Sequence, residues 1–236
     1  MKAILLAAGY GKRLRPLTEH KPKCLIELNG KPLLDIWINK LINLGVDEIL
    51  INTHYLAAQV EEFVSKHKFR DKIQLSHEKE IEGTAGTLIK NIDFFGSDDG
   101  LLIHADNFCA DNLEKFILAH SKRQEICDIT MLTFQCEHPK ECGIVEVDKR
   151  KIITKFYEKV DGFNGNMANG AIYCISKNAL LEISEKFSSA VDFSNEIVPN
   201  FLGRIYCYQS NQFFIDVGTI RNLIKAENFL KGQIYL

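Results

Sequence analysis

The N-terminal segment constrains this chain more than any other part of the sequence. Residues 2–7 (KAILLA) are almost entirely apolar, which is typical of a strand buried in a parallel sheet. Gly9 and Gly11 follow this run, and the cations Arg13 and Lys23 come next. Glycines let a backbone approach a ligand and direct its N–H groups at anionic oxygens, and the cations add full charges. This order predicts a site for a phosphorylated ligand.

The opening loop lacks the two most familiar phosphate-binding patterns, G-x-G-x-x-G and G-x-x-x-x-G-K-[ST]. A glycine turn after a strand is often only a turn. However, residues 6–18 read LAAGYGKRLRPLT and residues 22–25 read PKCL. This string of fixed spacing resembles the entry motif of the sugar-1-phosphate nucleotidylyltransferases, also called nucleotide-sugar pyrophosphorylases. The resemblance implies nucleotide contacts at Leu6, Ala8, Gly9 and Gly11, and catalytic roles for Arg13 and Lys23.

Length and charge limit the alternatives. A chain of 236 residues with 46% hydrophobic residues suits one sizeable α/β domain. The formal net charge of -2 argues against a nucleic-acid-binding protein and against a polybasic membrane protein. We therefore expect a single nucleotidyltransferase domain over residues 1–236. Residues 1–110 would mainly bind the nucleotide, and residues 111–236 would mainly bind the sugar phosphate and supply a closing helix.

The cysteines and the N-terminus predict a cytoplasmic protein. The seven cysteines are odd in number and dispersed, without a C-x-x-C pair, so neither a disulfide framework nor a zinc site is indicated. The N-terminus enters a strand without the pattern of a signal peptide, and no apolar run approaches ~18 residues. We expect no membrane partner, and a homo-oligomer remains open.

Alternating strand and helix patterns predict the fold class. The expected class is α/β, a Rossmann-like mixed, mostly parallel sheet flanked by helices, of the nucleotide-diphospho-sugar transferase type implied by the resemblance. Asn29-Gly30 predicts a tight turn, and Pro32 suits the first position of a helix. Thr219 is expected to cap the last helix. Strands are predicted at residues 48–52, 73–77, 100–105, 128–134, 143–147, 152–156 and 168–175, and helices at 57–66 and 223–230.

A second glycine-containing loop, EGTAGTL at residues 82–88, runs into a short helix that Thr84 could cap. The GTAG string resembles the second nucleotide loop of the family, which implies nucleotide contacts at Gly83 and Thr84. Upstream, Glu78 resembles a position that relatives use to read the base. Two readings of Glu78 stay open, a contact with a guanine edge and a solvated charge beside Lys79 and Glu80.

Two aspartates follow apolar runs that are far apart in the sequence. Asp106 follows residues 100–105, at a strand end where α/β sheets place ligands, and Asp216 lies in FFIDVGT at residues 213–219. Either aspartate could simply turn the chain. The first resembles the metal-binding aspartate of the family, and the second resembles its closing [FW]-x-D-[IV]-G-T motif. The resemblance implies that both bind one Mg²⁺, with Asp106 also counted as catalytic.

Three short stretches resemble the acceptor half of the family. Residues 142–148 (CGIVEVD) resemble Y-G-V-V-x-x-D, residues 156–160 (FYEKV) resemble F-x-E-K-P, and residues 169–173 (NGAIY) resemble N-x-G-I-Y. Read alone, Glu158-Lys159 could be a solvated charge pair, and Asn169-Gly170 could be a turn. Together they imply sugar-phosphate binding by Gly143, Glu158, Lys159 and Asn169, with Lys159 on the phosphate.

The reaction implied joins a nucleoside triphosphate and a sugar 1-phosphate to give a nucleotide-sugar and pyrophosphate. The best guess for specificity is a mannose- or heptose-1-phosphate guanylyltransferase. One alternative is a cytidylyltransferase of the same fold acting on a non-sugar phosphate such as phosphocholine, which would need an aromatic cage. Another is a non-catalytic nucleotide-sensing subunit, although Arg13, Lys23, Asp106 and Asp216 are all present.

Overall fold

The computed structural model describes residues 1–158 and 165–234 of the 236-residue chain. The chain divides into two compact units. Unit 1 contains Met1–Lys2, Glu82–Ile103 and Asp111–Gln212, and unit 2 contains Ala3–Ile81, His104–Ala110 and Phe213–Leu236. Each unit is therefore assembled from segments that lie far apart in the sequence.

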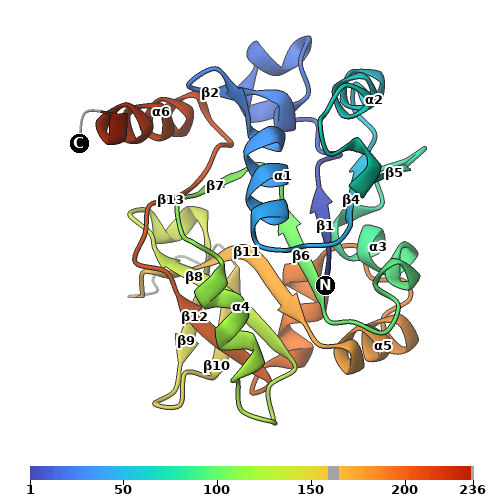
Figure 1. Ribbon diagram of the computed structural model, residues 1–236. Helices are drawn as coiled ribbons and strands as arrows, with labels where there is room; N and C mark the ends of the chain where they lie inside the picture. The colour runs from blue at the N-terminus through green and yellow to red at the C-terminus, as the bar shows by residue number, and fades with distance from the viewer. Residues whose placement is uncertain (159–164, 235–236) are drawn as a thin grey trace. The chain divides into compact units, whose positions relative to one another are not determined.

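Unit 2 contains the parallel strands β1 (Lys2–Leu6), β4 (Ile49–Thr53) and β5 (Ile73–His77), with β4 in the middle. Every residue of β4 is buried, as its position between two strands requires. The helices α1 (Leu33–Asn43) and α2 (Ala57–Ser65) precede and follow β4, and they lie beside these strands in Figure 1. Their apolar residues recur at helical spacing and form the buried faces.

A short hairpin in unit 2 confirms the predicted turn at Asn29-Gly30. β2 (Glu27–Leu28) and β3 (Lys31–Pro32) pair in antiparallel fashion around it. Both turn residues have positive φ, 54° at Asn29 and 75° at Gly30, which is the backbone that a two-residue hairpin favours. The prediction for Pro32 is wrong by one residue, because Pro32 ends β3 and α1 begins at Leu33.

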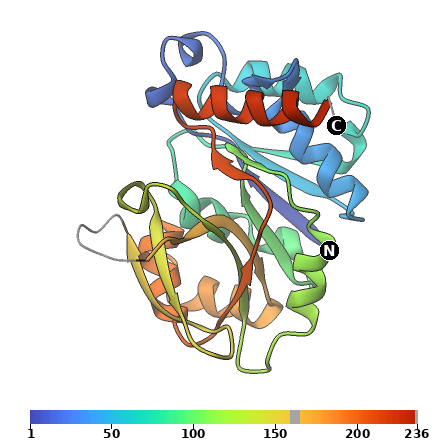
Figure 2. The ribbon, with the colours of Figure 1, turned by 90° about the vertical axis from the view of Figure 1, so that its left-hand side faces the viewer.

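The last segment of the chain also belongs to unit 2. β13 (Phe214–Asp216) pairs with β7 (Asn107–Cys109), and α6 (Ile220–Ile234) follows. Thr219 accepts a hydrogen bond from the Asn222 N–H at 3.2 Å, so it caps α6 as predicted. α6 packs against β2 and β13, and Figure 2 shows it in red directly after the short strand β13. Its packing rests on a buried cluster of Leu28, Leu33, Phe108, Val217 and Ala226.

Unit 1 is organised around β11 (Met167–Ile175), which pairs in antiparallel fashion with β6, β8 and β9 (Figure 1). β10 adds to β9 in antiparallel fashion, and β12 adds to β8 in parallel. The remaining elements are β6 (Gly100–His104), β8 (Ile129–Gln135), β9 (Gly143–Val147), β10 (Ile153–Glu158), β12 (Ile205–Gln209), α3 (Gly83–Lys90), α4 (Glu114–Ser121) and α5 (Lys177–Lys186).

The predicted α/β, Rossmann-like class is confirmed by parallel strands in unit 2, mixed strands in unit 1 and helices beside both. The predicted strands and helices are present with shifts of a few residues at their ends. The elements β7, α4, α5, β12 and β13 are among those that were not predicted. None of the described helices is long and apolar enough to cross a bilayer.

β11 contains an irregularity between Asn169 and Tyr173, where its register with β8 shifts. Ala171 has φ of 51°, a left-handed backbone that costs an L-residue about 1–2 kcal/mol. Ala171 occupies the position at which the resembling pattern N-x-G-I-Y has glycine. The Ala171 N–H donates to Asn169 Oδ1 at 2.9 Å, which stabilises this bend. The exchange of glycine and alanine in the sequence therefore has a local structural cost.

We expect Ala171→Gly to stabilise unit 1 by about 1 kcal/mol, because glycine adopts a positive φ without a Cβ clash. The matched control is Ala168→Gly in the same strand, which removes a buried methyl group and should destabilise by about 1 kcal/mol. Urea denaturation followed by circular dichroism measures both variants. A destabilised Ala171→Gly variant would show that the left-handed backbone is not under strain.

Candidate functional site

A cluster of two cations and two carboxylates lies in unit 2. Lys23 Nζ donates to Asp106 Oδ2 at 2.6 Å and to Asp216 Oδ1 at 3.1 Å. Arg13 Nη2 donates to the other oxygen of Asp216, Oδ2, at 3.2 Å. The Lys23 side chain is 9% exposed, whereas Arg13 is 66% exposed. Lys23 is therefore a buried connection between two acids, and Arg13 keeps most of its surface open to a ligand.

Strand pairing within unit 2 brings the two acids together. Asp106 directly precedes β7, and Asp216 is the last residue of β13. β7 and β13 pair so that Asp216 lies opposite Asn107, and the Val217 N–H donates to the Asp106 carbonyl oxygen at 3.0 Å. The antiparallel register thus places a C-terminal acid beside one from the middle of the chain.

The electrostatics of the cluster favour its charged forms. Burial acts to lower the pKa of Lys23, but Asp106 and Asp216 outweigh it and raise this pKa above its usual value. Burial acts to raise the pKa of Asp106, but the Lys23 ammonium and His104 outweigh it and hold this pKa below its usual value. Both groups are therefore ionised near neutral pH, and each stabilises the charge of the other.

The opening loop has two glycines with different structural roles. Gly11 has φ of 64°, and a Cβ there would lie 2.9 Å from Thr18 Cγ2, so glycine is required by the fold itself. At Gly9, no described atom other than its chain neighbours lies within 4 Å of an added Cβ. The fold does not explain Gly9, which fits the prediction that a ligand approaches the backbone here. Leu6 and Ala8 lie before it, and the Leu6 carbonyl oxygen accepts from the Ala105 N–H.

Glu78 follows β5 and is buried, with 1% of its surface exposed. Its Oε1 accepts from Asn52 Nδ2 at 2.8 Å, and Asn52 Oδ1 accepts from the Ala7 N–H at 2.6 Å. The alternative of a solvated charge at Glu78 is therefore wrong. Asn52 was not singled out from the sequence, although a polar residue that directly follows the apolar run 49–51 was a usable signal.

The second glycine loop lies in unit 1. Gly83 has φ of 76°, and a Cβ there would overlap the backbone of Val191. The prediction that Thr84 caps the helix is wrong, because α3 begins at Gly83 and Thr84 lies inside its first turn. Thr84 Oγ1 instead accepts from the Phe193 N–H at 2.7 Å. Gly83 and Thr84 thus hold the start of α3 against the segment that begins at Val191.

Three of the predicted acceptor residues lie on the neighbouring strands β10, β9 and β11 of unit 1. Gly143 lies opposite Glu158, and a Cβ at Gly143 would be 2.6 Å from Glu158 Oε2, so the absence of a side chain makes room for this carboxylate. Asn169 Nδ2 donates to the hydroxyl of Tyr173 at 2.6 Å, with Ser194 Oγ at 3.5 Å. Lys159 lies outside the described residues.

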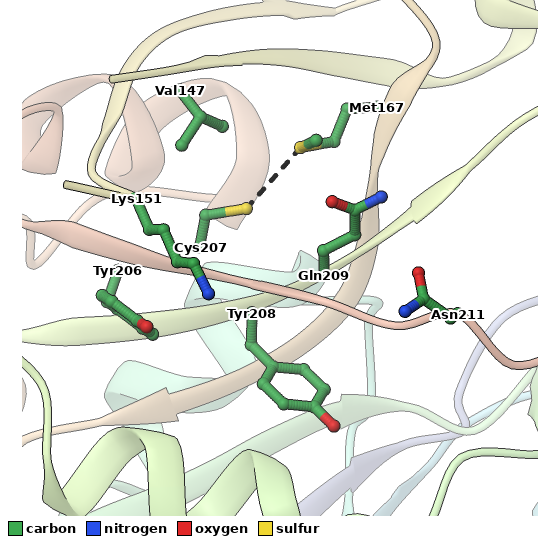
Figure 3. Close-up of a pocket in the computed structure, with 8 residues that line it drawn as sticks. All are labelled: Val147, Lys151, Met167, Tyr206, Cys207, Tyr208, Gln209 and Asn211. Atoms are coloured by element: carbon green, nitrogen blue, oxygen red, sulfur yellow. Dashed lines mark hydrogen bonds between the residues drawn. The ribbon is translucent and has the colours of Figure 1, made fainter. Parts of the chain in front are cut away.

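A separate cavity of about 260 Å³ also lies in unit 1, and its walls contain none of the predicted site residues. Figure 3 shows Lys151, Tyr206, Gln209 and Asn211 around it, with the Cys207 and Met167 sulfurs 3.6 Å apart at one side. The remaining lining residues are Val147 and Tyr208. The size of a hollow alone therefore does not identify the functional site, and the charged cluster of unit 2 is the stronger candidate.

A parallel sheet with a glycine loop, cations and carboxylates at its strand ends is typical of α/β proteins that bind phosphorylated ligands. A family model described as nucleotidyl transferase matches residues 2–233, and the chain belongs to this family. The family resemblance predicted from the sequence is thereby confirmed.

Individual relatives agree with this assignment. Mannose-1-phosphate guanylyltransferase catalytic subunit beta of Xenopus tropicalis is 29% identical over 99% of this chain, and that of Danio rerio is 31% identical over 99%. The chain spans 64% of the length of each of these two relatives. A Bacillus anthracis structure described as a glucose-1-phosphate thymidylyltransferase matches with a TM-score of 0.85 and 22% identity, over 97% of this chain and 94% of that one, which shows the fold.

We expect Lys23→Met to destabilise the protein by about 1–3 kcal/mol at pH 7, because two carboxylates lose their shared cation. In the wild type, the depressed pKa of Asp106 contributes stability above about pH 3.9 that is lost as the pH falls. In the variant, Asp106 keeps its burial but loses the Lys23 charge, so its pKa rises and the deficit should shrink between pH 7 and pH 4. Thermal unfolding measured across this range tests the effect, and a deficit independent of pH would contradict it.

Proposed function

We propose that this chain is a nucleotidyltransferase that joins a nucleoside triphosphate and a sugar 1-phosphate to give a nucleotide-sugar and pyrophosphate. The observation that carries the proposal is the hydrogen bonding of Lys23 to both Asp106 and Asp216, with Arg13 beside them. Family membership and the names of the curated relatives support the reaction class. A non-catalytic sensing subunit would not need all four of these side chains.

The chemical difficulty of this reaction is electrostatic. The sugar phosphate is itself the nucleophile, so no side chain needs to form a covalent bond with the substrate. Two unit charges ~4 Å apart at an effective dielectric of ~20 repel each other by about 4 kcal/mol. Fixed cations are required before in-line geometry can help. In our proposal, Lys23 draws the phosphates into line, and the exposed Arg13 stabilises charge on the departing pyrophosphate.

The residues present suit a divalent metal. Nucleotidyl transferases generally use one, and Mg²⁺ usually takes one or two protein carboxylates together with substrate phosphates and water. Among the described residues, no group of three or more metal-binding side chains occurs, but Asp106 and Asp216 share a partner and can supply two carboxylates. Bound there, Mg²⁺ would supply positive charge to the reacting phosphates.

Within each unit, the remaining site residues have separate roles in the proposal. In unit 2, backbone groups at Leu6, Ala8, Gly9 and Gly11 hold the phosphates, and Glu78 contributes to reading the base. For unit 1, the family resemblance assigns nucleotide contacts to Gly83 and Thr84 at the start of α3. Glu158 and Asn169 hydrogen-bond acceptor hydroxyls beside Gly143, and the family resemblance assigns the acceptor phosphate to Lys159, which lies outside the described residues.

A guanylyltransferase acting on mannose 1-phosphate is the specificity that we propose. The names of the curated relatives support both the base and the sugar. A buried carboxylate at Glu78 can accept hydrogen bonds from the donor edge of guanine. We also propose a cytoplasmic location, because the seven cysteines are free, and free thiols are typical of proteins in a reducing compartment. The oligomeric state, including a homo-oligomer, is left to measurement.

Pyrophosphate release over a matrix of GTP, CTP, UTP and dTTP against mannose 1-phosphate, glucose 1-phosphate and phosphocholine tests the proposal. We expect the highest kcat/KM for GTP with mannose 1-phosphate, and activity only when Mg²⁺ is present. Turnover of CTP with phosphocholine would favour the non-sugar alternative. A folded protein that releases no pyrophosphate from any pair would contradict the proposed enzyme class.

A further inference from the structure

Asn52 joins the opening loop to Glu78 inside unit 2. It is the fourth residue of β4, the strand between β1 and β5, and only 4% of its surface is exposed. Its Oδ1 accepts from the Ala7 N–H at 2.6 Å, and its Nδ2 donates to Glu78 Oε1 at 2.8 Å. One side chain therefore contacts both the backbone at the start of the opening loop and the carboxylate that follows β5.

A second connection runs between the same two segments. Tyr10 lies between Gly9 and Gly11, and its hydroxyl is 3.1 Å from His54 Nε2. His54 Nδ1 is 2.9 Å from the carbonyl oxygen of Glu78. Because a carbonyl oxygen only accepts, Nδ1 carries the proton, and in the neutral ring Nε2 accepts from Tyr10. Both the carboxylate and the backbone of Glu78 are thus linked to the opening loop.

We propose that Asn52 is a positioning residue that fixes the Glu78 carboxylate for base recognition and couples it to the opening loop. This inference rests on the proposed function, since it assumes that the nucleotide binds along this loop. Asn52 acts through Glu78 and the backbone of Ala7, and it need not touch the nucleotide.

The chemistry of the position explains why asparagine is needed there. The Ala7 N–H requires an acceptor, and the Glu78 carboxylate requires a donor, and a single amide provides both. Aspartate could still accept from Ala7, but it cannot donate when ionised and would add a like charge beside Glu78. Leucine has a similar volume and would leave both buried partners without this bond. The two substitutions therefore separate the two functions of the side chain.

Equilibrium binding without an acceptor sugar phosphate tests the inference directly. The probes are GTP, CTP, UTP and dTTP, together with inorganic tripolyphosphate, which has no base. For Asn52→Asp, we expect the preference for GTP over the other nucleotides to fall at least tenfold, with tripolyphosphate binding changed less than threefold. For Asn52→Leu, we expect tripolyphosphate binding to weaken as well, because the loop also loses its partner.

Two further variants control for a general loss of structure. Thr53 is the next residue in β4, is also buried and contacts His77. The variant Thr53→Val should therefore keep the wild-type base preference. The double variant Asn52→Asp with Glu78→Gln reverses donor and acceptor. It should regain thermal stability relative to Asn52→Asp without regaining the preference for GTP, because position 78 no longer has a carboxylate.

The outcomes separate this inference from the proposed function. An unchanged base preference in Asn52→Asp would overturn the inference. An equal loss of affinity for all four nucleotides and for tripolyphosphate would overturn it too. Equal affinity of the wild type for all four nucleotides would overturn it as well. A wild type that prefers GTP but releases no pyrophosphate with any acceptor would contradict only the enzymatic proposal.

Discussion

The shared hydrogen bonding of one buried ammonium group with two carboxylates is the interaction on which the candidate site depends. Lys23 donates a hydrogen bond to both Asp106 and Asp216. Without its positive charge, the two carboxylates would repel each other strongly, because they lie close together in a partly buried site. The same arrangement leaves carboxylate and guanidinium groups at one place on unit 2, with Arg13 largely exposed. A site of this kind can receive negative phosphates and a metal ion at the same time.

Much of the rest of unit 2 serves to hold this arrangement. The β7–β13 pair brings Asp216 to Asp106, and α6 anchors the pair through an apolar cluster. The opening loop turns at Gly11 against Thr18, whose hydroxyl donates to the Gly11 carbonyl oxygen at 2.8 Å. Asn52 then links this loop to Glu78. Charge, backbone geometry and a buried amide thus support one another within a single compact unit.

The sequence predicts the parts of the site that depend on chemical type and strand ends. Gly9, Arg13, Lys23, Asp106 and Asp216 are predicted chiefly from the family resemblance, because a glycine or an aspartate after a strand can also be part of an ordinary turn. The pairing of β13 with β7 could not be derived, because a three-residue strand has almost no periodicity of its own. Thr84 was misassigned because a cap and an interior threonine differ only in a tertiary contact, here with the Phe193 N–H. Asn52 was missed because the apolar run before it reads as ordinary core.

The central claim is that Arg13 and Lys23 supply the charge that lets two phosphates react. The most direct measurement is kcat at saturating GTP, mannose 1-phosphate and Mg²⁺ for Arg13→Ala and Lys23→Ala, with Arg15→Ala as the matched exposed cation of the same loop. With the circular dichroism spectrum unchanged, we expect kcat to fall about 10²–10³-fold in the first two variants and to stay nearly normal in the third. Equal rates in all three folded variants would contradict it.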